Sequence, residues 1–184
     1  TIDTALEGMI ETYEDIKRRV QEALDGYRRS RLSVVRPKQQ HDQPMQWRAL
    51  QLAIAGTSVW RRILVHDSLS LFDLHRIIMA VFGWSGQKLH GFIIDGDLYD
   101  AEEHGSDRDE RLMSLGDVFE KGIREFSYNY DYTAEWEVRI SLLHPLDGSE
   151  TPRSVCCVAG EGAAPPEHIG GRLLFGRFLF PFQR

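Results

Sequence analysis

Cysteine is almost absent from this chain of 184 residues, and the two that occur, Cys156 and Cys157, are adjacent. A disulfide between neighbouring cysteines would close a strained ring, so no disulfide framework is expected. No CxxC pair occurs, which excludes the usual zinc knuckle and the thioredoxin-like redox motif. Thiols without a disulfide are typical of a reducing compartment, and the sequence therefore predicts a cytoplasmic protein.

Long apolar runs and an excess of positive charge are also missing. No stretch approaches the ~18 consecutive apolar residues of a membrane span, and no signal-peptide pattern is visible. The net charge is -6, whereas a protein that covers nucleic acid normally presents a basic face. Membrane insertion and general nucleic-acid binding are therefore not expected. Basic residues do gather towards the N-terminal end, at Arg18, Arg19, Arg28, Arg29, Arg31, Arg36 and Lys38.

Sequence motifs that are characteristic of common enzyme classes are missing as well. The sequence contains no P-loop, no GxGxxG fingerprint, no GxSxG elbow, no HExxH and no EF-hand spacing. These absences exclude the usual nucleotide-phosphate sites and leave serine-hydrolase chemistry of that type without support. We expect no cofactor, and enzyme activity is not indicated.

What is present begins with an amphipathic N-terminal unit, residues 1–30. Over residues 3–29, apolar side chains recur at steps of three and four, which predicts a helix with one narrow apolar stripe. The stripe comprises Leu6, Ile10, Tyr13, Ile16, Val20, Leu24 and Tyr27. Such a helix packs either on its own domain or on a partner, for example in a homodimer. Residues 31–45 are polar and contain two prolines, which is typical of a linker.

Residues 46–184 show the patterns of an α+β domain. Alternation over 50–54 and a second run at 60–65 predict a hairpin, and Ser70 with Asp73 forms a capping-box pair before a helix that ends near Phe82. Asp95-Gly96 between short apolar runs predicts another hairpin. The fold expected is a mostly antiparallel sheet packed with helices, with the N-terminal helix appended.

The second half of this domain continues the same order. Residues 100–110 read as an acidic loop and 112–121 as a short helix. Alternation over 126–132 and 136–142 predicts two strands paired across Thr133-Ala134. From Val158 the sequence is rich in glycine and proline and is predicted to be a loop, ending in an apolar segment, 173–182, without clear period.

Histidines supply the most distinctive candidate site. His75 falls on or beside the apolar face of the predicted helix, and His90 begins a strand, so both read first as hydrogen-bonded core residues. Glu167 and His168 lie in a loop that could fold over the sheet. Together these four residues could form a mixed nitrogen and oxygen metal site, but spacing does not show that they meet, and we expect no bound zinc.

Arginines on the second predicted strand suggest an ion pair. Arg61 and Arg62 are adjacent, so only one can point inward. An inward arginine facing Asp131 would make a buried pair, either structural or anion-binding. The structural role is favoured.

Several of these residues form a combination found in a known family. The first half of the combination consists of Trp60-Arg61-Arg62-Ile63, Leu74-His75, Phe82-Gly83-Trp84, and His90 with Phe92. Then come Tyr128 to Asp131, Trp136, and a closing Gly160, Pro165, Pro166, Glu167, Gly170 and Gly171. Over roughly residues 46–171 the chain resembles the plasmid pRiA4b ORF-3-like family, which has no settled biochemical activity.

The chain departs from the family pattern at several polar positions. Thr133-Ala134 stands where the family usually has Gly-Asp, and Val138 where it usually has histidine. Ala164 replaces a frequent cysteine, and His168 stands where aspartate is usual. The resemblance therefore implies that any polar site of the family is degenerate here. Some members carry a label as transposon-associated resolvases, but this acidic chain lacks a nucleophilic serine amid arginines and a basic helix-turn-helix.

The leading functional prediction is a non-catalytic module that binds a small ligand or protein on a concave surface between the sheet and the Pro165-Pro166-Glu167 loop. Its candidate residues are Arg61, Arg62, His75, His90, Asp131, Trp136, Glu167 and His168. The alternative is a metal-dependent, hydrolase-like enzyme that uses His75, His90 and Glu167. A weaker alternative is a mobile-element accessory protein that contacts DNA through the basic N-terminal end.

Overall fold

The computed structural model describes residue 18, residues 46–101, 108–143 and 152–171, and residue 175. The predicted N-terminal helix over 3–29 and the linker over 31–45 therefore lie outside the described residues, apart from residue 18. The same holds for most of the apolar segment at 173–182. The fold described below is that of the domain predicted to begin at residue 46.

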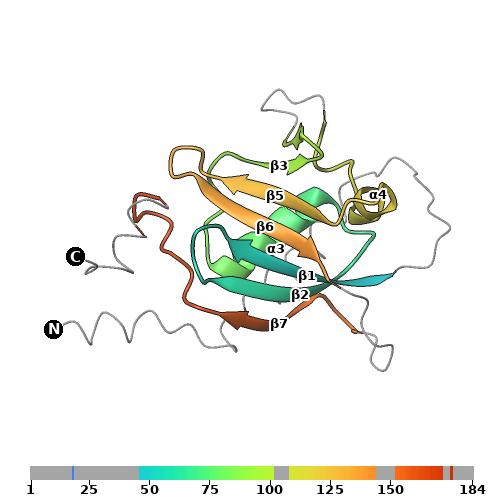
Figure 1. Cartoon of the computed structure of the whole chain (residues 1–184), viewed down its shortest axis with the longest axis horizontal. Coiled ribbons are helices and arrows are strands. Elements are labelled where there is room, and N and C mark those ends of the chain that lie inside the picture. Colours follow the sequence, from blue (N-terminus) through green and yellow to red (C-terminus); the bar gives the residue numbers. More distant parts are fainter. Residues whose placement is uncertain (1–17, 19–45, 102–107, 144–151, 172–174, 176–184) are drawn as a thin grey trace.

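One antiparallel sheet organises the domain (Figure 1). Its strands are β1 (Trp47–Ile54), β2 (Trp60–His66), β3 (His90–Ile94), β4 (Asp97–Tyr99), β5 (Glu125–Tyr130), β6 (Trp136–Leu142) and β7 (Cys156–Glu161). They follow the order β4-β3-β5-β6-β1-β2-β7, and every neighbouring pair is antiparallel. The predicted mostly antiparallel sheet is confirmed, and the described residues contain few helices beside it.

The predicted hairpins are present because their turn residues suit them. Asp95 and Gly96 both have positive φ, 53° and 84°, which is the backbone of the turn that best joins twisted antiparallel strands. Strands β5 and β6 pair with Tyr130 opposite Trp136, so the connection runs from Asp131 to Glu135. Both hairpins were recognisable because each forms between segments close in sequence.

Two helices complete the described part, α3 (Leu71–Phe82) and α4 (Leu115–Glu120). Helix α3 begins with the predicted capping box, in which Ser70 and Asp73 each accept a hydrogen bond from the other's backbone N–H. It lies against one face of the sheet, behind the strands in Figure 1. Helix α4 begins with a second capping box at Ser114 and is shorter than the predicted 112–121. Neither described helix is long and apolar enough to cross a membrane.

The core lies between α3 and the face of the sheet that α3 covers. Alternate strand residues point into it, and fully buried examples are Leu50, Leu52, Tyr128, Val138 and Ile140. The residues between them point to the opposite face, where Asn129 and Glu137 are only partly covered. We call that opposite side the outer face of the sheet.

The prediction of a loop from Val158 is wrong for its first residues. Strand β7 pairs with β2 through Trp60 opposite Glu161, with a register shift between Arg62 and Ile63. Its sequence, CCVAGE, does not alternate between apolar and polar residues, so the period-two signal of a strand is absent. Pairing with β2, which is distant in sequence, supplies what the local pattern does not show.

Candidate functional site

The two histidines singled out in the sequence meet in the core. His75 lies on α3 and His90 opens β3, and their rings stack with centroids 3.6 Å apart and planes 4° apart. They are 6% and 8% exposed. Nδ1 of His75 lies 2.7 Å from the Tyr128 hydroxyl on β5. The expectation that both are buried, hydrogen-bonded histidines is confirmed.

Glu110 completes this cluster. Its two carboxylate oxygens lie 3.0 Å and 3.2 Å from Nε2 of His90, and the residue is fully buried. Backbone bonding brings it there, because the Glu110 N–H donates to Asp100 and its carbonyl accepts from Phe72. An ionised carboxylate here requires a proton on Nε2 of His90. We call His75, His90, Glu110 and Tyr128 the histidine cluster.

Burial controls protonation within the histidine cluster. Desolvation, followed by the charges of His90 and Arg76, lowers the pKa of His75 from 6.5 to about 3. Burial also raises the pKa of Tyr128 well above its usual value, so the phenol keeps its proton. At neutral pH the bond between these two residues therefore joins two uncharged groups.

A second network fastens the end of the domain to the turn after α3. Residues 163–171, which we call the closing segment, carry Glu167. Its carboxylate accepts hydrogen bonds from the Ser85 backbone N–H at 2.8 Å and from the Ser85 hydroxyl at 2.7 Å. The Tyr130 hydroxyl donates to the same carboxylate and accepts from the Gly86 N–H at 3.0 Å. The segment thus closes over the turn through a charged acceptor.

Aromatic packing supports the same region. Trp84 stacks on Tyr130 with planes 6° apart and centroids 5.2 Å apart, and it also contacts Trp136. The Trp84 indole N–H donates to the Pro165 carbonyl at 3.0 Å.

Burial alone would raise the pKa of Glu167, but hydrogen bonds from Tyr130 and Ser85 outweigh it, so the pKa is lowered. The sequence predicted a concave ligand surface between the sheet and the Pro165-Pro166-Glu167 loop. In the structure, hydrogen bonds from Trp84, Ser85 and Tyr130 connect this loop to the rest of the domain.

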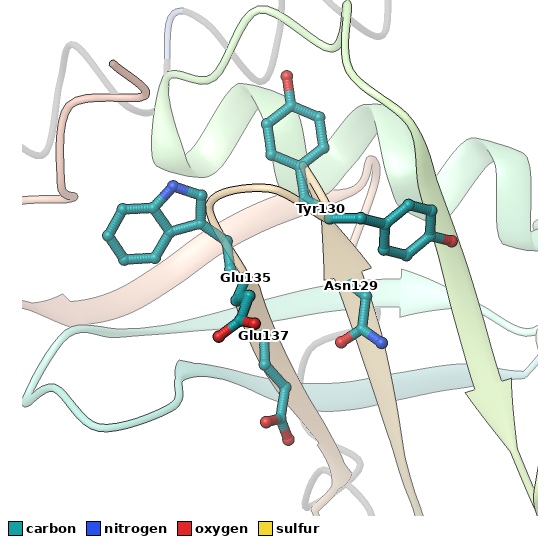
Figure 2. A pocket seen from close by; sticks show the side chains of 6 residues that line it. Asn129, Tyr130, Glu135 and Glu137 are labelled. Atoms are coloured by element: carbon teal, nitrogen blue, oxygen red, sulfur yellow. The ribbon is translucent and has the colours of Figure 1, made fainter. Parts of the chain in front are cut away.

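A pocket of about 200 Å³ opens beside Tyr130, at the turn end of the β5–β6 hairpin. It is lined by Asn129, Tyr130, Tyr132, Glu135, Trp136 and Glu137. Figure 2 shows Glu135 and Glu137 extending on the same side of the hairpin. The rings of Tyr130 and Trp136 are buried and pack on Trp84 in the core. The fully buried Trp136 has no hydrogen-bond partner for its indole N–H among the described residues. Of the eight residues predicted from the sequence, only Trp136 lines this pocket.

The predicted ion pair between an inward arginine and Asp131 is wrong. Arg61 does point inward and is 2% exposed, whereas Arg62 is exposed. However, β2 lies three strands away from β5, about 14 Å at the usual strand spacing. Arg61 instead donates to the carbonyls of Trp60 and Glu161, at 2.8 Å and 3.0 Å.

Asp131 has a local role in its turn. Its φ is 52°, and its carboxylate accepts from the backbone N–H groups of Thr133 and Ala134. Lys88 lies 4.0 Å away on the exposed side. The residue therefore shapes the connection between β5 and β6, a common use of aspartate in turns.

The side chains of His75, His90 and Glu167 do not come together as a set of metal ligands. The two histidines bond Tyr128 and Glu110, while Glu167 bonds Ser85 and Tyr130. Within the described ranges, no group of three or more histidine, cysteine, aspartate or glutamate side chains is arranged to hold a metal ion. His168 is exposed on the closing segment.

Sequence reasoning missed most of the polar residues that the structure brings together. The sequence pattern indicates only an acidic loop at Glu110 and a turn at Ser85. Asn129, Glu135 and Glu137 were strand or turn residues without a recognisable motif. Alternation along β5 and β6 does place Asn129 and Glu137 on the outer face, and this was the one usable signal.

An uncharacterized protein and a crystal structure of a protein of unknown function are similar to this chain. "Uncharacterized protein y4hQ" of Sinorhizobium fredii is 32% identical over 119 residues, which is 61% of this chain and 60% of that protein. The chain thus matches less than two thirds of that relative's length. The crystal structure of MM3350, a protein of unknown function from Methanosarcina mazei Go1, is 31% identical with a TM-score of 0.63. That match covers 74% of this chain and 80% of MM3350.

The family model described as plasmid pRiA4b ORF-3-like protein matches residues 45–181. That range contains the histidine cluster, the closing segment and the pocket, and it agrees with the motifs recognised in the sequence. The chain therefore belongs to the plasmid pRiA4b ORF-3-like family.

Proposed function

We propose that this domain is a non-catalytic binding module whose ligand site is the pocket at the turn end of the β5–β6 hairpin. The observation that carries the proposal is the composition of the pocket wall, in which two carboxylates, of Glu135 and Glu137, lie with the amide of Asn129 and the exposed ring of Tyr132. Ligand sites typically combine an apolar or aromatic wall with a few polar groups that fix orientation.

The wall favours a ligand with a positively charged group. Glu135 and Glu137 supply negative charge, and Tyr132, which is 47% exposed, supplies an aromatic ring whose face attracts cations. Asn129 adds both a donor and an acceptor. An ammonium or guanidinium group on a small molecule or a peptide fits this chemistry best.

The histidine cluster gives less support to an enzyme. Both imidazoles are buried and bonded to protein groups, so a reacting molecule would first have to displace part of the core. A metal-dependent hydrolase using His75, His90 and Glu167 would also require Glu167 to leave Ser85 and Tyr130. A role in contacting DNA through the N-terminal end concerns residues outside those described.

Titration of the 15N-labelled full chain with acetyl-arginine amide tests the proposal. We expect chemical-shift changes centred on the amides of Asn129 and Glu137, and none with acetyl-glutamine amide, which lacks the charge. The double variant Glu135→Gln, Glu137→Gln should weaken binding about tenfold. Glu120→Gln on α4 is the matched control, because that glutamate is exposed and remote from the pocket lining.

The proposal fails if acetyl-arginine amide produces no localised shift changes at millimolar concentration. It also fails if Glu120→Gln weakens binding as much as the double variant, since the effect would then reflect net charge alone.

A further inference from the structure

An apolar patch lies on the outer face of the sheet next to the pocket. Its residues are Leu89, Ile93, Leu98 and Tyr132, which are 52%, 37%, 42% and 47% exposed. Ile93 on β3 pairs with Leu98 on β4. Leu89 immediately precedes β3 and lies four positions before Ile93, an even step that puts both on one side of an extended chain. These four residues, which we call the apolar patch, are among the few large apolar side chains that the described part of the domain exposes.

Gly91 joins the apolar patch to the pocket. A Cβ atom at this position would lie 2.7 Å from Cδ1 of Leu98 and 2.9 Å from the Tyr132 hydroxyl, closer than real Cβ contacts. The absence of a side chain at Gly91 therefore lets Leu98 and Tyr132 approach each other across β3. Because Tyr132 also lines the pocket, the two surfaces are continuous.

The charges around this surface leave an excess of negative charge at the pocket. Arg139 pairs with Glu137 at 3.5 Å, Lys88 lies 4.0 Å from Asp131, and Arg108 pairs with Asp97 at 2.5 Å. Glu135 has no such partner within the described residues. Burial, followed by the charges of Asp100 and Glu110, raises the pKa of Tyr132, which is consistent with a negative surrounding. A partner with a basic group would complement this charge.

We infer that the partner is an extended segment of another protein that places a basic side chain in the pocket and aliphatic side chains on the apolar patch. This inference rests on the proposed function, because it assigns the same pocket to a peptide. From β6 to β4 the surface spans three strand spacings, about 14 Å. An extended chain covers that distance in about four residues. The segment recognised thus has a basic residue and an aliphatic residue four positions apart, with a second aliphatic residue between them.

The test uses blocked pentapeptides and the full chain. The first probe has the order arginine, serine, valine, serine, valine, and the second is its reverse, because the partner can cross the strands in either direction. A third replaces both valines of the tighter probe by serine. We expect the tighter valine peptide to bind at least about fivefold more strongly than the serine peptide or acetyl-arginine amide, because it buries apolar surface. Its shift changes should extend from Asn129 to Gly91.

Variants of the apolar patch provide the matched comparison. Leu98→Ser should weaken the valine peptide about fivefold and leave acetyl-arginine amide unchanged. Leu112→Ser is the control, because Leu112 is 64% exposed and is not among the residues that define the patch or the pocket. Equal dispersion of the amide spectra would establish that both variants are folded.

The outcomes separate the two proposals. If acetyl-arginine amide binds as tightly as the peptides and Leu98→Ser has no effect, the peptide inference is overturned and the pocket proposal stands. If no probe binds, or if peptide binding is insensitive to Glu135→Gln with Glu137→Gln, both are overturned.

Discussion

The imidazole of His75 stacks in parallel on that of His90, with ring centroids 3.6 Å apart, in the core between α3 and the sheet. Each ring has its own partner, Tyr128 for His75 and Glu110 for His90. Protonation of both stacked imidazoles is energetically unfavourable, because two like charges at this distance repel strongly where water is excluded. The arrangement therefore keeps His75 neutral and uses it as a hydrogen-bonding core residue.

Replacing His75 by alanine should lower the free energy of unfolding by ~1–3 kcal/mol, because the buried Tyr128 hydroxyl loses its partner. Urea denaturation near neutral pH measures the change. His168→Ala is the control, since His168 is exposed, and it should change stability by less than ~0.5 kcal/mol. Equal stability of the two variants would show that His75 contributes nothing through its bond.

Stability should also fall in mild acid because of His75. The unfolded chain binds a proton at this residue below its ordinary pKa of 6.5, whereas the folded chain does so only near 3. The contribution of His75 is therefore complete above pH 6.5. It is lost as the pH falls from 6.5 towards 3, by up to ~1.4 kcal/mol per pH unit.

The variant His75→Gln isolates this contribution, because glutamine does not titrate. The wild-type free energy of unfolding should decrease more steeply between about pH 7 and about pH 5 than that of the variant. The other titrating groups are common to both proteins and cancel in the comparison. Parallel curves would contradict the depressed pKa of His75.

Glu110 should be coupled to His90 energetically. Removing one member of a buried pair leaves the other without its partner, which typically costs ~3–5 kcal/mol. We therefore expect Glu110→Ala and His90→Gln each to be strongly destabilising, and the double variant to be less so than the two losses added. A double-mutant cycle measured by urea denaturation gives the coupling, with Glu120→Ala in place of Glu110→Ala as the control. Additive losses would show that the bond does not contribute.

The sequence predicted the parts of this fold that depend on nearby residues. Ser70 and Asp73 form their capping box within one helical turn, and Asp95-Gly96 joins β3 to β4 directly. The alternation of β5 and β6 follows from one face being buried and one exposed. In each case the determining contacts join residues close along the chain.

The parts that were missed depend on contacts between distant residues. Strand β7 forms because it pairs with β2, and Glu110 enters the core because its backbone bonds Asp100 and Phe72. The order of strands also separates Arg61 from Asp131, which residue types alone could not reveal. The sequence therefore identified His75 and His90, which stack in the core, but not Glu110, which bonds His90.

Ser85 and Glu167 should be coupled in the same way across the closing segment. The Glu167 carboxylate accepts two hydrogen bonds from Ser85, and hydrogen bonds to a charged group contribute more than neutral ones. A cycle of Ser85→Ala and Glu167→Gln should give a coupling of ~1 kcal/mol, because the bonds are partly exposed to water. Since the pKa of Glu167 is lowered, this contribution is present above its ordinary pKa of 4.5 and is lost as the pH falls through the lower, folded value.

Hydrogen exchange provides a local measurement of this contact. The backbone N–H of Ser85 donates to Glu167, so Glu167→Ala should make that amide exchange faster, along with the neighbouring Gly86, which donates to Tyr130. The amide of Phe92 in the middle of β3 should be unaffected, because its surroundings do not change. If the Ser85 amide exchanges at the same rate in the variant, the carboxylate does not hold the closing segment on the turn.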